Sequence, residues 1–377
     1  MTFSADIARD ARPRRTRRQT ITCLAGLSLG LFPGLAPADS PQTVHLAAGF
    51  RISDEGEVLR LPPIPGGPER VVIHAMTADP SGRFIAVAGD DLAIRLIDVA
   101  GMRLVRTIRP EGEHHHRDTI RSLAFDRSGR RMVSTGNDGR IVIYDAASSF
   151  EAVQSTGGAP ALACIRFSPD GRQMAAVGFD SEVFLIGKTN GRAKLRCGCR
   201  DLRGIAYSDD GRLLAVGGRV GDVHLFSTSP PEEIGDFPLH KGRIRALAFR
   251  RDSATLVTVG EDGALVVFDT DKREILSRVT VANCHLYCAA MLDSRLVATG
   301  GSDNRIHLID SDAGKVIGHL PGHQGTIADV VSSGDWLYSG SYDATVRRWS
   351  LRSLENLAPQ LAGNEQRIAE GQPTLDR

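Results

Sequence analysis

The chain repeats one pattern of short apolar runs and polar turns seven times. Each unit starts with an apolar run such as Ile120–Phe125, passes through a polar turn such as Asp126–Gly129, and enters a second run that ends near Gly and Asp. A β-branched third run such as Ile141–Tyr144 and a looser fourth segment complete the unit. Such runs, separated by Asp, Ser, Pro and Gly, are typical of β-strands joined by turns. None of the segments between them is long enough to predict a helix.

The spacing of the units is regular. A large apolar residue ends the third run of each unit, and successive ones are 47, 42, 40, 42, 41 and 40 residues apart. A period near 40 residues over seven units of four strands predicts an all-β fold, a seven-bladed β-propeller of four-stranded antiparallel blades over residues 57–352. The apolar residues are Ile97, Tyr144, Ile186, Phe226, Phe268, Ile309 and Trp349. Six of them follow an Asp by six positions, namely Asp91, Asp138, Asp180, Asp262, Asp303 and Asp343, whereas Val220 stands at the seventh Asp position.

The units resemble WD repeats, most clearly in the last one. His323, Asp343 and Trp349 stand at the family's His, Asp and Trp positions, with Ser339 or Ser341 as the hydroxyl partner. The resemblance implies a hydrogen-bonded tetrad that ties the loop before the inner strand to the third strand, because a buried indole N–H and a buried carboxylate both need partners.

The other units depart from the family pattern. Ile, Tyr or Phe replaces Trp, and only His240 is clearly a second unit-opening His. We therefore expect those blades to depend more on apolar packing. We interpret the spaced Asp residues as turn formers with a structural role, not as catalytic groups.

The first 38 residues differ from the rest in composition. Five Arg residues between positions 12 and 18 precede an apolar run at 20–32 and the small-residue sequence Ala36–Ala38. This predicts an export signal with cleavage after Ala38, and therefore a periplasmic or secreted bacterial protein. Residues 16–21 resemble a twin-arginine signal, although the Sec route stays open. An uncleaved anchor and a misassigned start codon are the alternatives.

Removal of this leader changes the charge of the chain. The leader carries a net charge of +4, so the remainder carries −3, against +1 for the whole sequence. A nucleic-acid-binding domain would be strongly basic, so we expect no nucleic-acid partner. No apolar run of about 20 residues remains to span a membrane.

Two segments compete to close the last blade. Residues 39–56 are a polar lead-in, and Val58–Ile64 is expected to form an outer strand, with Pro62 and Pro63 acceptable only at an edge. Residues 354–361 could fill the same place from the C-terminal tail, 353–377, which is otherwise polar and expected to be disordered. We favour the N-terminal strand, because such a strand often closes the ring in WD-repeat propellers.

Cysteine and histidine residues suggest weaker hypotheses. After the leader the chain has five Cys, and no CxxC pair or set of four converging ligands indicates zinc, so we expect no metal and no cofactor. Cys164 and Cys288 fit buried inner-strand positions, and Cys197 and Cys199 are a weak redox candidate. The run His114–His116 could capture a metal ion, but one of its rings could instead be a unit-opening His.

A recurring basic position points to binding. The second residue of several inner strands is Arg121, Arg203 or Arg245, with Tyr287 in the sixth unit. In WD repeats this position falls near the channel mouth, and Arg and Tyr are enriched at binding hot spots. We predict a cationic patch for an acidic segment of a partner. The alternative is that each Arg pairs with an acid in the next blade's loop.

No catalytic motif stands out. The sequence contains no P-loop, GxSxG elbow or HExxH pair. We therefore predict a non-catalytic scaffold for protein–protein interaction, acting as a monomer within a complex. The alternative is a propeller enzyme, or an accessory subunit of a periplasmic redox or cell-envelope complex, with a site at the channel mouth.

Overall fold

A computed structural model describes most of the region predicted to form the propeller. The predicted export signal, much of the lead-in and the tail at 353–377 lie outside the described residues. Within the described part of the chain, no helix is long and apolar enough to cross a membrane. The described residues are 43–45, 51–53, 56–187, 192–198, 200–251 and 254–352.

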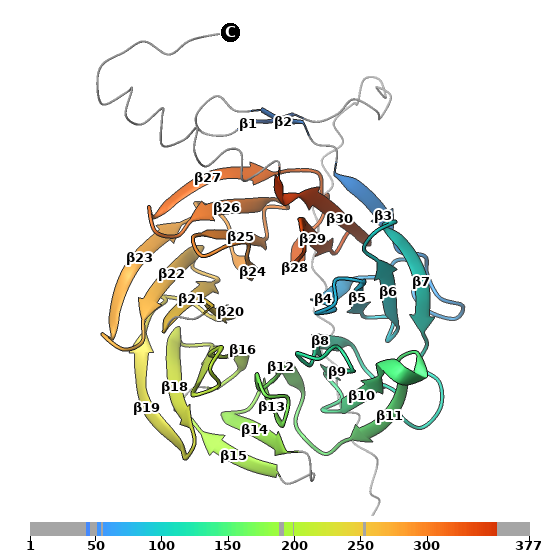
Figure 1. The fold of residues 1–377 in the computed structure, drawn as a ribbon, viewed down its shortest axis with the longest axis horizontal. Helices are drawn as coiled ribbons and strands as arrows, with labels where there is room; N and C mark the ends of the chain where they lie inside the picture. The colour runs from blue at the N-terminus through green and yellow to red at the C-terminus, as the bar shows by residue number, and fades with distance from the viewer. Residues whose placement is uncertain are drawn as a thin grey trace, which may run out of the picture. The chain divides into compact units, whose positions relative to one another are not determined.

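Seven four-stranded antiparallel sheets follow one another around a ring, which confirms the predicted propeller (Figure 1). Blades 1 and 2 comprise β4 (Ile73–Ala78), β5 (Phe84–Gly89), β6 (Ile94–Asp98), β7 (Arg103–Ile108), β8 (Ile120–Phe125), β9 (Arg131–Gly136), β10 (Ile141–Asp145) and β11 (Glu151–Thr156). Blades 3 and 4 comprise β12 (Leu162–Phe167), β13 (Gln173–Gly178), β14 (Glu182–Gly187), β15 (Arg192–Arg196), β16 (Leu202–Tyr207), β17 (Leu213–Gly218), β18 (Asp222–Thr228) and β19 (Pro231–Pro238). Blades 5 and 6 comprise β20 (Ile244–Phe249), β21 (Thr255–Gly260), β22 (Ala264–Asp269), β23 (Glu274–Thr280), β24 (Leu286–Met291), β25 (Leu296–Gly301), β26 (Ile306–Asp310) and β27 (Lys315–Leu320). Blade 7 comprises β28 (Ile327–Ser333), β29 (Trp336–Ser341), β30 (Thr345–Ser350) and β3 (Glu57–Arg60). A 3₁₀ turn, η1 (Ala146–Ser148), follows β10, and β1 (Thr43–His45) pairs with β2 (Arg51–Ser53).

The N-terminal strand β3 completes the last blade. It pairs antiparallel with β30, and the Leu61 amide donates to the Ala344 carbonyl oxygen at 2.9 Å. The strand ends before Pro62, since proline lacks the N–H that a ladder needs. Strands from the two ends of the propeller therefore share one sheet, which closes the ring and covers the outer edge of β30.

The hydrophobic core lies between neighbouring sheets. Seven clusters of buried residues occur, and each combines side chains from two adjacent blades, including blades 7 and 1. The residues at the Trp position are all buried, whether they are Ile97, Phe226 or Trp349. Complete burial of one such side chain contributes about 1.5–3 kcal/mol, so this position stabilises its blade whether or not it is Trp.

Candidate functional site: the central channel

The spaced Asp residues cap the turn between the second and third strands of most blades. In five blades the Asp carboxylate accepts a hydrogen bond from the backbone N–H two residues later, at 2.9–3.3 Å. The residue between them has a positive φ of 63–74°. Such local bonds stabilise left-handed turns. The five are Asp91, Asp138, Asp262, Asp303 and Asp343, whereas Asp180 accepts from the neighbouring Ser181 amide instead.

Blade 7 assembles the residues that the family resemblance singled out. His323 Nδ1 lies 3.0 Å from Asp343 Oδ2, and His323 Nε2 lies 2.6 Å from Ser339 Oγ. The His323 and Trp349 rings meet edge to face, with centroids 6.2 Å apart. Ser341 donates to the Gly325 carbonyl oxygen instead, so Ser339 is the hydroxyl partner. Burial alone would raise the pKa of Asp343, but hydrogen bonds from His323 and Thr345 hold it far below its ordinary value.

Blade 5 repeats this arrangement without Trp. His240 Nδ1 lies 2.9 Å from Asp262 Oδ1, and His240 Nε2 lies 2.8 Å from Thr258 Oγ1. Burial would raise the pKa of Asp262, but hydrogen bonds from His240 and the Lys241 amide lower it to about 2. The carboxylate therefore stays ionised at neutral pH and links the loop before β20 to the β21–β22 turn.

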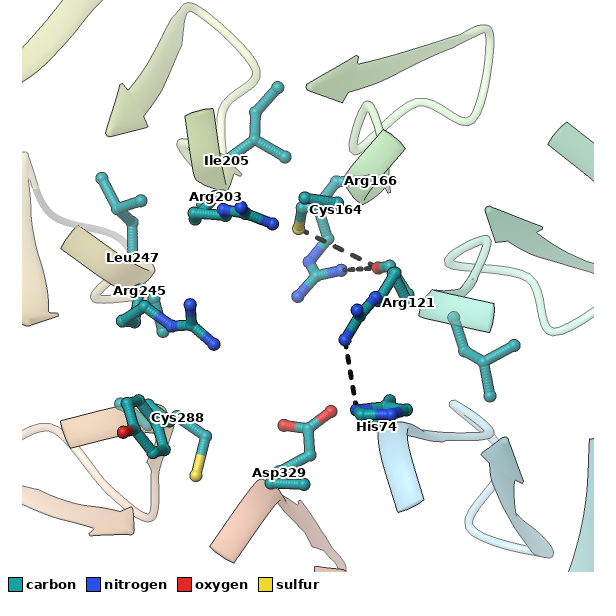
Figure 2. A pocket seen from close by; sticks show the side chains of 18 of the residues that line it. His74, Arg121, Cys164, Arg166, Arg203, Ile205, Arg245, Leu247, Cys288 and Asp329 are labelled. Carbon is teal, nitrogen blue, oxygen red and sulfur yellow. Dashed lines mark hydrogen bonds between the residues drawn. The ribbon is translucent and has the colours of Figure 1, made fainter. Parts of the chain in front are cut away.

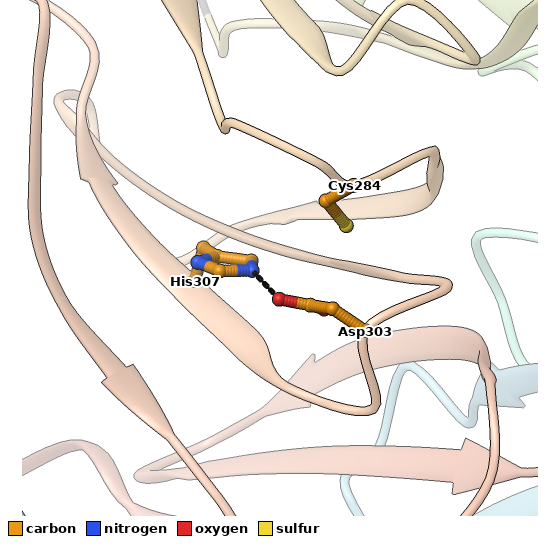
Figure 3. A group of neighbouring side chains, drawn as sticks. All are labelled: Cys284, Asp303 and His307. Carbon is orange, nitrogen blue, oxygen red and sulfur yellow. Dashed lines mark hydrogen bonds and ion pairs between the residues drawn. The ribbon is translucent and has the colours of Figure 1, made fainter.

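In blades 1 and 6 the spaced Asp has a different side-chain partner, which the sequence analysis missed. Asp91 forms an ion pair with Arg95 at 2.6 Å, and both side chains are fully buried. Asp303 lies 2.9 Å from His307 Nε2 in the equivalent position (Figure 3). In both cases the partner comes four residues after the Asp, on the third strand. A basic residue at that spacing was the signal in the sequence.

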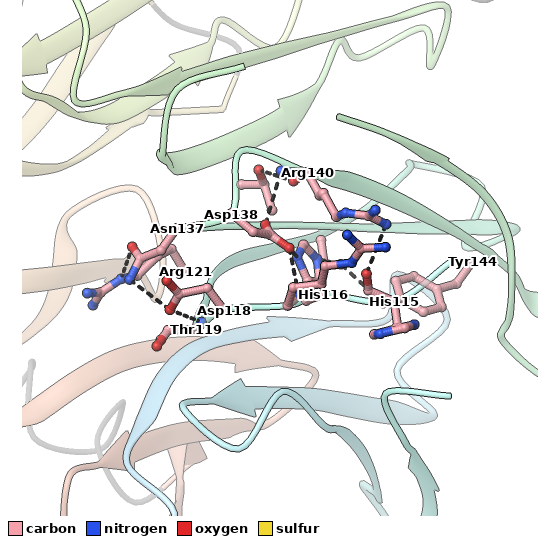
Figure 4. A network of polar contacts seen from close by, with 12 residues as sticks. His115, His116, Asp118, Thr119, Arg121, Asn137, Asp138, Arg140 and Tyr144 are labelled. Carbon is pink, nitrogen blue, oxygen red and sulfur yellow. Dashed lines mark hydrogen bonds and ion pairs between the residues drawn. The ribbon is translucent and has the colours of Figure 1, made fainter. Parts of the chain in front are cut away.

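Blade 2 contains a third unit-opening histidine, His116. Its Nδ1 lies 3.0 Å from Asp138 and its Nε2 lies 2.7 Å from the Ser134 hydroxyl (Figure 4). The prediction that only His240 clearly accompanies His323 was therefore too narrow. The other two histidines of the run contact different groups: His114 Nδ1 lies at the Ser155 hydroxyl, and His115 Nδ1 lies at the Gly112 carbonyl oxygen. The three rings thus have three separate partners.

The inner strands surround a channel that contains a cavity of about 150 Å³ (Figure 2). The four residues predicted as a binding patch all line it, namely Arg121, Arg203, Arg245 and Tyr287. His74 occupies the same strand position in blade 1, and the same count along the sequence would have found it. We call these five residues the channel mouth.

Carboxylates partly neutralise the channel mouth. Arg203 lies 2.5 Å from Asp201, and Arg245 lies 3.5 Å from Glu261. Arg243 bridges these two acids, at 2.9 Å from each. The acids belong to the same blades as Arg203 and Arg245, so the alternative of pairing with the next blade's loop does not describe these two arginines.

Arg121 differs from the other arginines of the channel mouth. Its Nε donates to Asn137 Oδ1 at 3.0 Å and its Nη1 donates to His74 Nδ1 at 3.3 Å. No carboxylate among the described residues lies within ion-pairing distance of it. Burial, together with the charges of Arg121 and Arg245, lowers the pKa of His74 to about 4, so His74 is neutral at pH 7.

Two further charges lie within the channel. Arg166 Nη1 donates to Ser122 Oγ at 3.1 Å and to the Ile165 carbonyl oxygen at 2.8 Å. Asp329 accepts from the Met76 amide at 2.8 Å and the Val330 amide at 2.9 Å. Burial raises the pKa of Asp329 to about 6, although these amides and the charge of Arg166 oppose the shift. The sequence analysis did not identify Arg166, Asp329 or His74 as channel residues, because it compared only one strand position and left out blade 1.

Aromatic rings border the arginines. The Arg203 guanidinium carbon lies 3.9 Å from the centre of the Phe179 ring, and that of Arg245 lies 4.9 Å from the Tyr287 ring. Phe179 and Tyr342 are 44% and 37% exposed. Both immediately precede a spaced Asp, a signal that the sequence analysis did not use. The channel opening therefore combines cationic and accessible aromatic surface.

The cysteine hypotheses are only partly addressed by the structure. Cys164 and Cys288 are buried and line the channel, and burial raises the pKa of the Cys288 thiol well above its ordinary value. The buried Cys197 thiol donates to the Ser181 carbonyl oxygen at 3.6 Å. Cys199 lies outside the described residues, so a Cys197–Cys199 redox pair stays a prediction.

Three segments of the chain match the family model "WD domain, G-beta repeat": residues 104–145, 231–269 and 314–350. Each segment starts with the outermost strand of one blade and includes the first three strands of the next. The segments therefore contain blades 2, 5 and 7, the blades in which a loop His meets Asp and a hydroxyl group. The three-residue arrangement and the family match therefore occur in the same blades.

Several proteins are similar to this chain. Actin-interacting protein 1 of Drosophila melanogaster is 25% identical over 337 residues, which cover 74% of this chain and 54% of that protein. Protein groucho of Drosophila melanogaster is 24% identical over 235 residues, covering 62% and 32%. WD repeat-containing protein 36 of Homo sapiens is 26% identical over 148 residues, covering 38% and 16%. The chain thus spans about half of the first relative and less of the others, and the similarity supports a WD-repeat propeller. These relatives are animal proteins and leave the predicted bacterial export untested.

Proposed function

We propose that this chain is a non-catalytic scaffold for protein–protein interaction whose channel mouth binds an acidic segment of a partner protein. Its likeness to WD-repeat proteins, one of them named for its interaction with actin, supports the general role. The observation that carries the specific site is the convergence of Arg121, Arg203 and Arg245 on one opening, with Arg121 lacking a carboxylate partner among the described residues.

The electrostatics of the opening favour an anionic ligand. Burial lowers the pKa of Arg203, and the nearby charges of Arg245 and Arg121 lower it further while Asp201 opposes the shift. The cations therefore repel one another, and a bound carboxylate relieves that repulsion. A guanidinium group binds a carboxylate through two parallel hydrogen bonds, which gives orientation as well as affinity.

The aromatic residues supply the apolar part of the site. Tyr287 and Phe179 lie beside arginines and Tyr342 lies beside His74, and interface hot spots are rich in Tyr and Arg. We therefore expect the partner segment to combine acidic residues with an apolar side chain that packs on these rings.

The experiment starts with affinity capture by the purified chain, followed by measurement of the dissociation constant with the isolated partner segment. The double variant Arg121→Glu/Arg245→Glu should weaken binding at least about 30-fold, the effect of losing one hot spot of about 2 kcal/mol. Arg172→Glu is the matched control, because the Arg172 side chain is 80% exposed and lies outside the channel. Higher salt should weaken binding by the wild-type chain. Equal affinity of the double variant and the control would refute the acidic-segment site.

We also propose that the chain acts outside the cytoplasm, so that its partner belongs to the periplasm or the cell envelope. The basic leader, the apolar run and Ala36–Ala38 support this location. Extracts of those compartments are therefore the first source in which to search for the partner.

A catalytic channel is the second candidate, and Asp329 is the observation that favours it. A carboxyl group with a pKa near 6 inside a cavity that also contains Arg166 suits general acid–base catalysis. Screening the chain and Asp329→Asn against hydrolase and lyase substrates tests this candidate. An activity lost in the variant supports catalysis, whereas an activity that the variant retains contradicts a role for Asp329.

A further inference from the structure

Blade 6 brings three metal-binding side chains together from separate segments. Cys284 lies in the loop before β24, Asp303 in the β25–β26 turn, and His307 on β26 (Figure 3). Their Sγ, carboxylate oxygen and ring nitrogen all lie within 4.8 Å of one another, the only such group among the described residues. Cys284 and His307 are buried, whereas the Asp303 side chain is 24% exposed, which leaves a path from solvent.

The departure of blade 6 from its neighbours creates this group. In blades 2, 5 and 7 a loop histidine contacts the spaced Asp and the hydroxyl group of the residue four positions before that Asp. In blade 6 that hydroxyl belongs to Thr299, which donates to the Cys288 carbonyl oxygen at 2.7 Å instead. The loop supplies Cys284 in place of a histidine, so a thiol approaches the carboxylate of Asp303.

Comparison with blade 1 shows what blade 6 lacks. There the equivalent carboxylate, Asp91, is neutralised by the permanent cation of Arg95. In blade 6 the residue four positions after the Asp is His307, and no Lys or Arg among the described residues forms an ion pair with Asp303. A divalent cation would supply that positive charge, and His307 in its neutral form is a ligand for it.

We propose that Cys284, Asp303 and His307 form a zinc site, with water in the fourth position. Thiolate, imidazole and carboxylate are the ligands zinc prefers, whereas Ca²⁺ and Mg²⁺ favour oxygen ligands alone. Bonds of about 2.0–2.3 Å place tetrahedral ligand atoms about 3–4 Å apart, within reach of side-chain rotation from the present positions. Coordination forms the Zn–S bond and releases the thiol proton to solvent. The site is independent of the proposed function of the channel mouth.

Cobalt titration of the full-length chain tests the site, because tetrahedral Co²⁺ bound to thiolate has an intense visible spectrum and a thiolate-to-metal charge-transfer band. We expect one equivalent to bind and to be displaced by Zn²⁺. Cys284→Ser should abolish the charge-transfer band, and His307→Gln should lower affinity at least about 10- to 100-fold. Cys164→Ser and His115→Ala are the controls and should bind as the wild-type chain does. A wild-type chain without the band, or a band that persists in Cys284→Ser, overturns the proposal.

A second measurement needs no variant. The folded wild-type chain is exposed to a thiol-alkylating reagent, with and without prior zinc loading, and the modified peptides are identified by mass spectrometry. We expect zinc to slow the modification of Cys284 and to leave the rates of modification of Cys164 and Cys288 unchanged. Equal protection of all three thiols, or none, contradicts coordination by Cys284.

Discussion

The ion pair between Asp91 and Arg95 leads to a quantitative prediction. Both side chains are fully buried, Arg95 Nη2 lies 2.6 Å from Asp91 Oδ2, and the same nitrogen donates to the Pro62 carbonyl oxygen at 2.7 Å. Arg95 Nε and Nη1 have no hydrogen-bond partner within the described part of the chain. The pair therefore anchors the segment that connects β3 to β4, and neither of its two charges is accessible to water.

The structure sets the size of the effect. Two unit charges about 4 Å apart interact by about 4 kcal/mol at an effective dielectric constant of about 20. Removing one member of a buried pair typically costs about 3–5 kcal/mol, because the other charge stays buried and unpaired. We expect Asp91→Asn and Arg95→Leu each to lower the free energy of unfolding by about 3–5 kcal/mol. The double variant should lie within about 1 kcal/mol of the wild type, since it buries no charge and loses mainly the bond to Pro62.

Urea unfolding measures these differences. Fluorescence of Trp336 and Trp349 reports on blade 7, circular dichroism reports on all sheets, and coincident transitions justify a two-state treatment. Arg172→Ala is the control, because its 3.7 Å contact with Asp170 is exposed and contributes at most about 1 kcal/mol. A loss for Asp91→Asn no larger than that of the control would refute the reasoning. So would a double variant whose loss equals the sum of the two single losses.

Four further predictions concern the pH dependence of stability at two carboxyl groups, a turn and export. The pKa of Asp262 in the folded chain is about 2, below its ordinary 3.8. The ionised carboxylate therefore stabilises the fold fully above pH 3.8, and this stabilisation is lost as pH falls through 2. The difference in stability between the wild type and Asp262→Asn should shrink over that range. The contribution of Asp329 to stability changes with pH in the opposite direction, because its pKa is raised to about 6. In urea titrations, the wild type should become more stable relative to Asp329→Asn as pH falls from about 7 to about 4. An unchanged difference contradicts this. Gly139→Ala should cost several kcal/mol in thermal melts, since its Cβ would lie 1.9 Å from a carbonyl oxygen, whereas Gly158→Ala, with positive φ but open space, should cost only about 1–2 kcal/mol. Expression in a bacterial host followed by N-terminal sequencing should show a chain that begins immediately after Ala38, and an uncleaved chain contradicts the predicted signal.

The blades and their strands could be derived from the sequence because the information is local. Alternating apolar runs, turn residues and the spacing of Asp to the large apolar residue all lie within one unit of about 40 residues. The hydrogen bonds of His323 and His240 also join residues of one unit, 16–22 positions apart. The patch residues Arg121, Arg203 and Arg245 could be found because a shared strand position faces the channel in every blade.

Only the tertiary structure decided which residues meet across the ring. Arg166 and Asp329 belong to blades 3 and 7 and occupy different strand positions, so no single register count relates them to the patch. Within blade 6, only the fold showed that Cys284 reaches the turn Asp that the loop histidines of blades 2, 5 and 7 contact, because Cys284 does not stand at their position in the unit. Strand patterns determine which face a side chain lies on. Closure of seven sheets into a ring determines its neighbours, because those contacts join segments that are far apart in the chain.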